Sequence, residues 1–253
     1  MENTEKNFTE KYFDAAREIL ARITAEESTA FDLAAETLAR AYANGKKIYI
    51  FGCTHSAILA EDVFYRAGAP AFWRPLWGPG MSIAQTPGFL TSAAEHNEQL
   101  GADIVNCSRL EAGDALVVLS TSGKNAAPVA VAETALKRGV KVIAVTSGNY
   151  RAETGNHSRI ANLYALRNEL ILIDNHVPQG DASVTVCGDT PMAPLSTIAG
   201  SFIVHTLSAL TVEKLRAAGI EPPVFLSSNA PGGKERNEAL LKDPEIRSTF
   251  LLP

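Results

Sequence analysis

Residues 115–125 read ALVVLSTSGKN, which is five consecutive apolar residues followed by three hydroxyl side chains, a glycine and a lysine. An uninterrupted apolar run of this length is typical of a strand that is buried on both faces of a parallel sheet. Polar residues directly after such a strand lie at its carboxyl end, where ligands bind in open parallel sheets. This segment therefore predicts both a fold class and the place of a site.

The same pattern recurs on both sides of this segment. Further apolar runs occupy residues 48–51, 71–73, 140–145 and 170–173, and helix-length segments cover 58–67, 93–105 and 128–138. Alternation of strands and helices predicts a parallel sheet with helices on both faces. Apolar stripes at helical spacing also predict two helices within 8–45 and a long helix over 198–215. The expected fold is a three-layer αβα sandwich with a five-stranded parallel sheet and extra N-terminal helices.

The chain shows no linker-like change of composition. We therefore expect one domain over residues 1–253, with N-terminal helices at 8–45, an αβα core at 46–219 and a C-terminal tail at 220–253.

Composition excludes several classes of protein. The chain has 253 residues, 23 Lys+Arg against 28 Asp+Glu, a net charge of −5 and 46% hydrophobic residues, as expected of a globular protein. The acidic balance argues against a nucleic-acid partner. No apolar run approaches the ~18–20 residues of a membrane helix, so no membrane partner is expected. Residues 1–11 carry no secretory pattern, and the three cysteines form no CxxC pair, which favours a cytoplasmic location.

A second small, hydroxylated loop follows the first strand. Residues 52–56 read GCTHS and lead into a helix, as residues 120–125 do. Backbone amides, hydroxyls and the positive helix end would suit an anion, although any helix cap uses the same residue types. Two such loops on neighbouring strands favour a ligand over a pair of caps.

Other phosphate and nucleophile motifs do not fit. The Gly123-Lys124-Asn125 segment lacks the earlier glycine and the Ser/Thr of a Walker A loop, and the chain has no GxSxG motif. The first loop has Thr54 where a dinucleotide fold has its second glycine. Because Arg74 follows the second strand and would suit a 2′-phosphate, NADP binding stays open as an alternative.

The two loops together resemble the SIS (sugar isomerase) domain family, whose SxSG loop holds the phosphate of a phosphosugar; here this loop is residues 120–123. Residues 52–68, 113–146, 174–182, 196–197 and 221–225 are similar to a single-domain branch of phosphosugar isomerases, distantly similar to phosphoheptose isomerase. The resemblance implies a flavodoxin-like sandwich and a homodimer or homotetramer with active sites shared between subunits.

The sequence departs from this family at two places. Asn125 stands where SIS loops commonly carry Ser or Thr, and Lys124 adds a charge, so a sulfonate of a sulfosugar is open as the anion beside a phosphate. The acidic helix residue of phosphoheptose isomerase has no match, since Arg66 occupies its offset and Glu61 comes too early.

Aldose–ketose isomerisation requires a base that moves a proton between C1 and C2 and a group that handles hydroxyl protons. Glu95 is the candidate base, with the alternative that it closes a capping box with Ser92. His55 is the candidate proton carrier, because a helix start favours the neutral imidazole; the alternative is a histidine that only caps the loop.

Other polar residues have weaker patterns. Asn175, His176 and Asp181 follow the last strand and would bind sugar hydroxyls, whereas a metal site there lacks ligand spacing. His96 is expected to be exposed and His205 to be a core histidine. Residues 229, 234 and 237 in the tail would either reach a neighbouring subunit or lie in solvent.

These interpretations predict an enzyme that isomerises an anionic sugar through an enediol, without a redox cofactor or metal. A non-catalytic sugar-phosphate sensor and an amino-sugar-phosphate lyase or deaminase are the alternatives. Glu95 and His55 are the predicted catalytic residues, and the predicted substrate-binding residues are Gly52, Thr54, Ser56, Ser120, Thr121, Ser122, Lys124, Asn125, Asn175 and Asp181.

Overall fold

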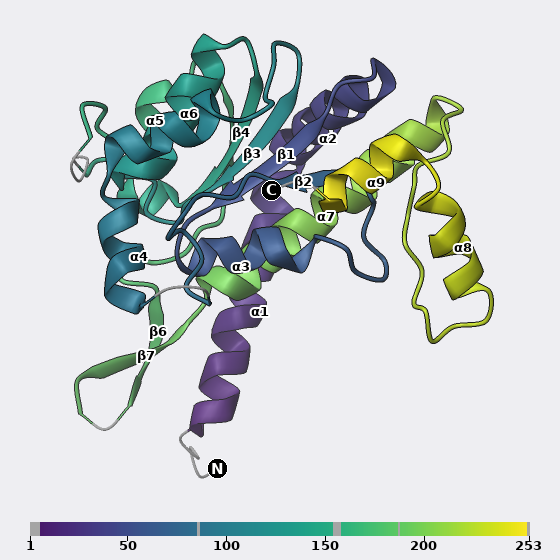
Figure 1. Ribbon diagram of the computed structural model, residues 1–253. Coiled ribbons are helices and arrows are strands. Elements are labelled where there is room, and N and C mark those ends of the chain that lie inside the picture. Colours follow the sequence, from purple (N-terminus) through teal and green to yellow (C-terminus); the bar gives the residue numbers. More distant parts are fainter. Residues whose placement is uncertain (1–5, 85–86, 154–157, 187, 252–253) are drawn as a thin grey trace.

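Five parallel strands form a central sheet with helices on both faces (Figure 1). The structure is a computed structural model that describes residues 6–84, 87–153, 158–186 and 188–251. The strand order is β2-β1-β3-β4-β5. The strands are β1 (Ile48–Gly52), β2 (Trp73–Pro75), β3 (Ala115–Leu119), β4 (Lys141–Thr146) and β5 (Ile171–Asp174). The predicted α/β class and five-stranded parallel sheet are confirmed.

Side chains that alternate along each strand feed two separate cores. Ile48 and Ile50 of β1 pack with the helices on one face, whereas Tyr49 and Phe51 pack with those on the other. The first face carries α1 (Phe8–Glu26), α2 (Ser28–Ala43), α3 (His55–Asp62) and α7 (Ser196–Ala217), and the second carries α5 (Glu98–Asn106) and α6 (Ala126–Lys137). All residues of β1 and β3 are buried, which explains their continuous apolar runs.

The edge strand starts two residues later than its apolar run predicts. The backbone N–H of Ala71 donates to Pro223 O at 2.6 Å, and that of Phe225 donates to Ala69 O at 3.1 Å. Residues 69–71 are therefore held by the C-terminal part of the chain, and pairing with β1 begins only at Trp73.

The helix expected over 93–105 is two helices, α4 (Gly88–Glu95) and α5. The break falls at Asn97, whose side chain accepts a hydrogen bond from the Leu100 N–H at 3.0 Å and so caps α5. The helix expected over 58–67 is α3, which starts at His55 and already ends at Asp62.

Three further features were not predicted or are now defined more closely: a hairpin, two short 3₁₀ helices and the C-terminal tail. An antiparallel hairpin of β6 (Ala182–Val186) and β7 (Thr190–Pro194) was not expected, and Tyr12 of α1 donates its hydroxyl hydrogen to Pro194 O at 2.8 Å. Two short 3₁₀ helices cover Gly148–Tyr150 and Leu163–Leu166. The tail forms α8 (Gly233–Leu240) and α9 (Pro244–Leu251), and Phe250 of α9 stacks on Phe64 at 5.0 Å between ring centroids.

Within the described ranges, no helix is long and apolar enough to cross a membrane.

Candidate functional site

The first loop (residues 52–56) makes a sharp turn between β1 and α3. A Cβ atom on Gly52 would lie 2.3 Å from Ser56 O, so only glycine allows this turn. Thr54 has φ +50°, and its N–H donates to Met81 O at 2.7 Å. The N–H groups of Ser56 and Ala57 close local turns onto Cys53 O and Thr54 O. These backbone amides are therefore used within the protein, and the first loop offers a ligand mainly its side chains.

The second loop (residues 120–125) joins β3 to α6. Gly123 has φ +63°, and a Cβ there would lie 2.4 Å from Thr146 Oγ1. The Gly123 N–H donates to Ser120 Oγ at 3.2 Å, which leaves the Ser120 hydroxyl hydrogen available. Within the part of the chain that the structure describes, the Ser122 hydroxyl makes no hydrogen bond. The first amides of α6 also lack intrahelical partners, so this loop can surround an anion with donors.

The two loops meet at Glu95. They lie side by side because β1 and β3 are neighbours in register, with Gly52 opposite Leu119. Asn125 of the second loop forms a side-chain hydrogen bond with the Glu95 carboxylate, and His55 of the first loop is close enough for its charge to act on the same group. Glu95, His55 and Asn125 are thus brought together by three separate elements.

Burial is the largest influence on Glu95 and raises the pKa of its carboxyl group. The hydrogen bond from Asn125 and the positive charges of His96 and His55 lower it in part. The capping-box interpretation with Ser92 is wrong, because α4 begins at Gly88 and places Glu95 at its last residue. A partly buried carboxylate with a raised pKa is suited to proton transfer.

His55 is the exposed member of this group. It is the first residue of α3, and its side chain makes no hydrogen bond to any of the described residues. Cys53, beside it, is buried, and its Sγ lies 3.3 Å from Met81 Sδ. Burial and the nearby Glu95 raise the pKa of the Cys53 thiol well above its usual value, so this group stays protonated.

Lys124 is already paired. Its ammonium group forms an ion pair with Glu153 and lies 5.8 Å from the ring centroid of Tyr150. Glu153 also accepts a hydrogen bond from Gln179 Nε2 at 2.8 Å. The sequence contains no local signal for this contact, since the paired residues are 29 positions apart.

Asn175 lies beside the second loop and Asp181 beside the start of α7, and both side chains are engaged with the protein. Asn175 Nδ2 donates to Thr121 Oγ1 at 3.2 Å, and its Oδ1 accepts the Val177 N–H. Asp181 accepts hydrogen bonds from the N–H groups of Leu195 and Ser196 and from the Ser196 hydroxyl at 2.5 Å. In this geometry Asn175 fixes Thr121 and Asp181 fixes the start of α7.

Two histidines lie in carboxylate contacts that the sequence did not predict. His176 is buried and its Nε2 lies 3.1 Å from Glu27 Oε1. The expectation that His205 is a core residue is wrong, because its side chain is 37% exposed and bonds Asp62 Oδ2 at 2.8 Å. Among the described residues, no group of three or more His, Cys, Asp or Glu side chains is arranged to hold a metal ion.

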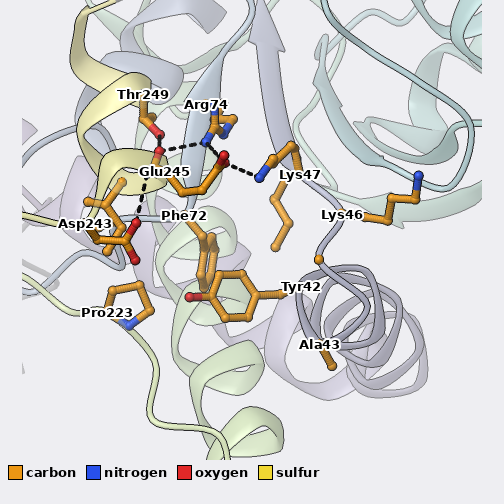
Figure 2. A pocket seen from close by; sticks show the side chains of 14 residues that line it. Tyr42, Ala43, Lys46, Lys47, Phe72, Arg74, Pro223, Asp243, Glu245 and Thr249 are labelled. Atoms are coloured by element: carbon orange, nitrogen blue, oxygen red, sulfur yellow. Dashed lines mark hydrogen bonds and ion pairs between the residues drawn. The ribbon is translucent and has the colours of Figure 1, made fainter. Parts of the chain in front are cut away.

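A separate cavity lies at the amino end of the sheet, away from the two loops. Figure 2 shows Lys47 and Arg74 pointing toward Glu245 of α9. Arg74 donates to the Glu245 carbonyl oxygen at 2.9 Å and lies 3.5 Å from its carboxylate. Arg74 thus contacts the C-terminal helix and does not face the first loop, so this arrangement gives the NADP alternative no support.

The fold and the pair of loops define a class of protein. The family model for the SIS domain matches residues 11–147, which is more than half of the chain. The chain belongs to the SIS domain family, and the resemblance seen in the two loops is confirmed. Within this family it is similar to the UPF0309 protein of Streptomyces griseus (39% identity over 236 residues, 92% of this chain and 93% of that protein) and to that of Shouchella clausii (34% over 238 residues, 93% and 96%).

Solved structures show the same fold at low sequence identity. A phosphoheptose isomerase from Neisseria gonorrhoeae aligns with a TM-score of 0.50 at 18% identity, over 79% of this chain and 94% of that one. The Vibrio vulnificus NanR protein complexed with ManNAc-6P aligns with a TM-score of 0.51 at 14% identity, over 93% of this chain and 69% of that one. At these identities the likeness concerns the fold alone.

Proposed function

We propose that this protein is a cytoplasmic isomerase that interconverts an aldose and a ketose bearing a terminal phosphate or sulfonate. The observation that carries the proposal is the meeting of Glu95, His55 and the second loop at the carboxyl ends of β1 and β3. Membership of the SIS family supports a sugar-binding or isomerase-like role for this edge of the sheet.

In the proposed reaction the second loop holds the anion. The hydroxyls of Ser120 and Ser122 and the first amides of α6 donate to its oxygens. Lys124 lies beside the loop, where its ion pair with Glu153 offsets its charge. Thr121 is kept in place by Asn175 and does not itself need to move. Thr54 and Ser56 face the sugar from the first loop.

Glu95 then acts as the base. Its carboxylate removes the proton from C2 of the aldose and returns it to C1, while negative charge develops on the enediolate oxygens. His55, exposed at the start of α3, carries the proton between the two hydroxyl oxygens. Asn125 orients the carboxylate through its hydrogen bond. We also propose that the protein assembles as a homodimer or homotetramer, as the family resemblance implies.

The test is incubation with candidate sugar phosphates and sulfosugars in deuterated water, followed by NMR or mass spectrometry. Deuterium at C1 or C2 of one of them is the expected result. Failure of every candidate to exchange counts against an isomerase.

The Vibrio vulnificus NanR protein, whose structure is a complex with ManNAc-6P, shares this fold, so sugar-phosphate binding alone is a second candidate function. Saturable binding of a sugar phosphate without deuterium exchange would therefore indicate a sensor and not an isomerase. Exchange accompanied by loss of water or ammonia would indicate the lyase or deaminase alternative.

A further inference from the structure

A second cavity lies beside the edge strand β2, between α5 and α9, and has a volume of about 360 Å³. It is distinct from the candidate functional site, since its lining includes no residue of the first or second loop and not Glu95. The residues that matter for its chemistry are Tyr49, Arg74, Trp77, Ile104, Arg109 and Thr249.

Two guanidinium groups line this cavity from different elements. Arg74 is paired in register with Tyr49 on the neighbouring strand, so both side chains leave the same face of the sheet. Arg109 comes from the segment between α5 and β3. Burial and, after it, the carboxylates of Asp114 and Glu111 raise the pKa of the Tyr49 hydroxyl, whereas the positive charges of Arg74 and Arg109 lower it. Both guanidinium groups are thus close enough to act on the same oxygen.

These charges are incompletely neutralised. Arg109 makes no ion pair or hydrogen bond with any residue in the described ranges. The carboxylate nearest to Arg74 is that of Glu245 at 3.5 Å, and its side chain is 67% exposed. The carboxylate in the cavity lining, Asp103, accepts a hydrogen bond from Gln99 at 2.8 Å. In a chain of net charge −5, this is a local site that attracts anions.

The remaining walls are apolar and partly aromatic. The Trp77 side chain is 40% exposed and contributes to the cavity together with Leu76, Leu100 and Ile104. An indole and two guanidinium groups favour a planar ligand body, because aromatic rings stack on both. Binding sites for small organic molecules combine such apolar walls with a few polar groups that fix orientation.

We propose that this cavity is a second ligand site, which binds a small organic anion with a flat apolar body. Arg74 and Arg109 hold the phosphate, sulfonate or carboxylate group, and the Trp77 indole lies against the body of the ligand. The helix α9 closes one side through Thr249, so the C-terminal tail is part of this site.

Phenyl phosphate is a suitable probe, because it combines an anionic group with a flat apolar ring. Trp77 reports on its binding through intrinsic fluorescence. The second tryptophan, Trp73, is buried and bonded to Ser208 at 2.9 Å, which keeps it away from the probe. We expect saturable quenching in the millimolar range or below, and no such signal in Trp77→Phe. Inorganic phosphate, which has no apolar ring to contact Trp77, is expected to bind more weakly.

Three variants make the test specific. Arg109→Ala should weaken phenyl phosphate binding by about tenfold or more, which corresponds to about 1.4 kcal/mol. Arg167 is an exposed arginine whose side chain, among the residues that the structure describes, donates only to the Tyr164 carbonyl, so Arg167→Ala should bind as the unaltered protein does. Ser122→Ala, in the second loop, should also leave the quenching unchanged. Circular dichroism and a thermal melt confirm that Arg109→Ala is folded.

Several results would overturn the proposal. They are the absence of saturable quenching, quenching that persists in Trp77→Phe, equal affinity of Arg109→Ala and the unaltered protein, or loss of the signal in Ser122→Ala, which would assign the probe to the second loop.

Discussion

The side-chain amide of Asn125 donates a hydrogen bond to the carboxylate of Glu95 and so joins the start of α6 to the end of α4. Burial of Glu95 favours the protonated carboxyl, whereas this bond favours the carboxylate. Burial outweighs the bond, so the pKa of Glu95 stays above that of an exposed glutamate. One residue of the second loop thereby shifts the protonation equilibrium of the candidate base toward the carboxylate.

This relationship predicts a pH dependence. Glu95 must be ionised to act as a base, so the rate falls as the pH drops through its raised pKa. Asn125→Ala removes a bond to the charged form, which raises this pKa further and moves the acidic limb of the kcat/KM profile to higher pH. The measurement is deuterium exchange against pH for both proteins. An acidic limb at the same pH in both would show that the bond does not tune the base.

Removal of the carboxylate gives a second prediction. Glu95→Gln keeps the size of the side chain but cannot accept a proton, so exchange at C1 or C2 should fall by about 10²- to 10⁴-fold. The dissociation constant for the same sugar should change little. The matched control is Glu98→Gln on α5, which removes a carboxylate that pairs with Arg159 and leaves Glu95 in place. Unchanged turnover in Glu95→Gln would remove this residue from the mechanism.

The glycine of the second loop gives a third prediction. Gly123→Ala meets two obstacles, a φ of +63° and a Cβ position 2.4 Å from Thr146 Oγ1. Gly45→Ala meets only the first, because its φ is +71° and no atom lies within 4 Å. We expect Gly45→Ala to lower the free energy of unfolding by about 1 kcal/mol and Gly123→Ala to lower it by clearly more, or to prevent folding. Urea denaturation of both variants measures this. Equal losses of unfolding free energy would show that the second loop accommodates the added Cβ atom without further destabilisation.

The sheet could be predicted from the sequence because its signal is local. Strands such as β3 are buried on both faces, so five apolar residues in a row suffice to define them. The start of β2 could not be predicted, since residues 69–71 pair with residues 223–225, more than 150 positions away. The hairpin β6–β7 was missed because Pro191 and Pro194 interrupt any alternating pattern on its second strand.

The candidate site could be predicted only in part, for a related reason. The composition of the two loops predicted that they offer hydrogen-bond donors to a ligand, and the strand order brings the loops together. How those donors are used depends on contacts between distant segments. Lys124 meets Glu153, and Glu95 meets Asn125, whereas Ser92 and Glu95 had the spacing of a capping box without being at a helix start.

The fourth prediction concerns Asp181, because its two candidate roles predict different effects on the affinity for the sugar. Its carboxylate accepts three hydrogen bonds at the start of α7, two of them from backbone N–H groups. Asp181→Ala should therefore lower the free energy of unfolding by about 1–2 kcal/mol, as loss of a helix cap does. If Asp181 serves only α7, the affinity of the folded variant for the sugar should stay the same. If Asp181 also binds sugar hydroxyls, the affinity should fall together with the stability.

Asp189→Ala, at an exposed position between β6 and β7, is the control for loss of a negative charge without loss of a cap. Urea denaturation together with a binding titration separates the two roles, because the structural role alone moves only the first measurement.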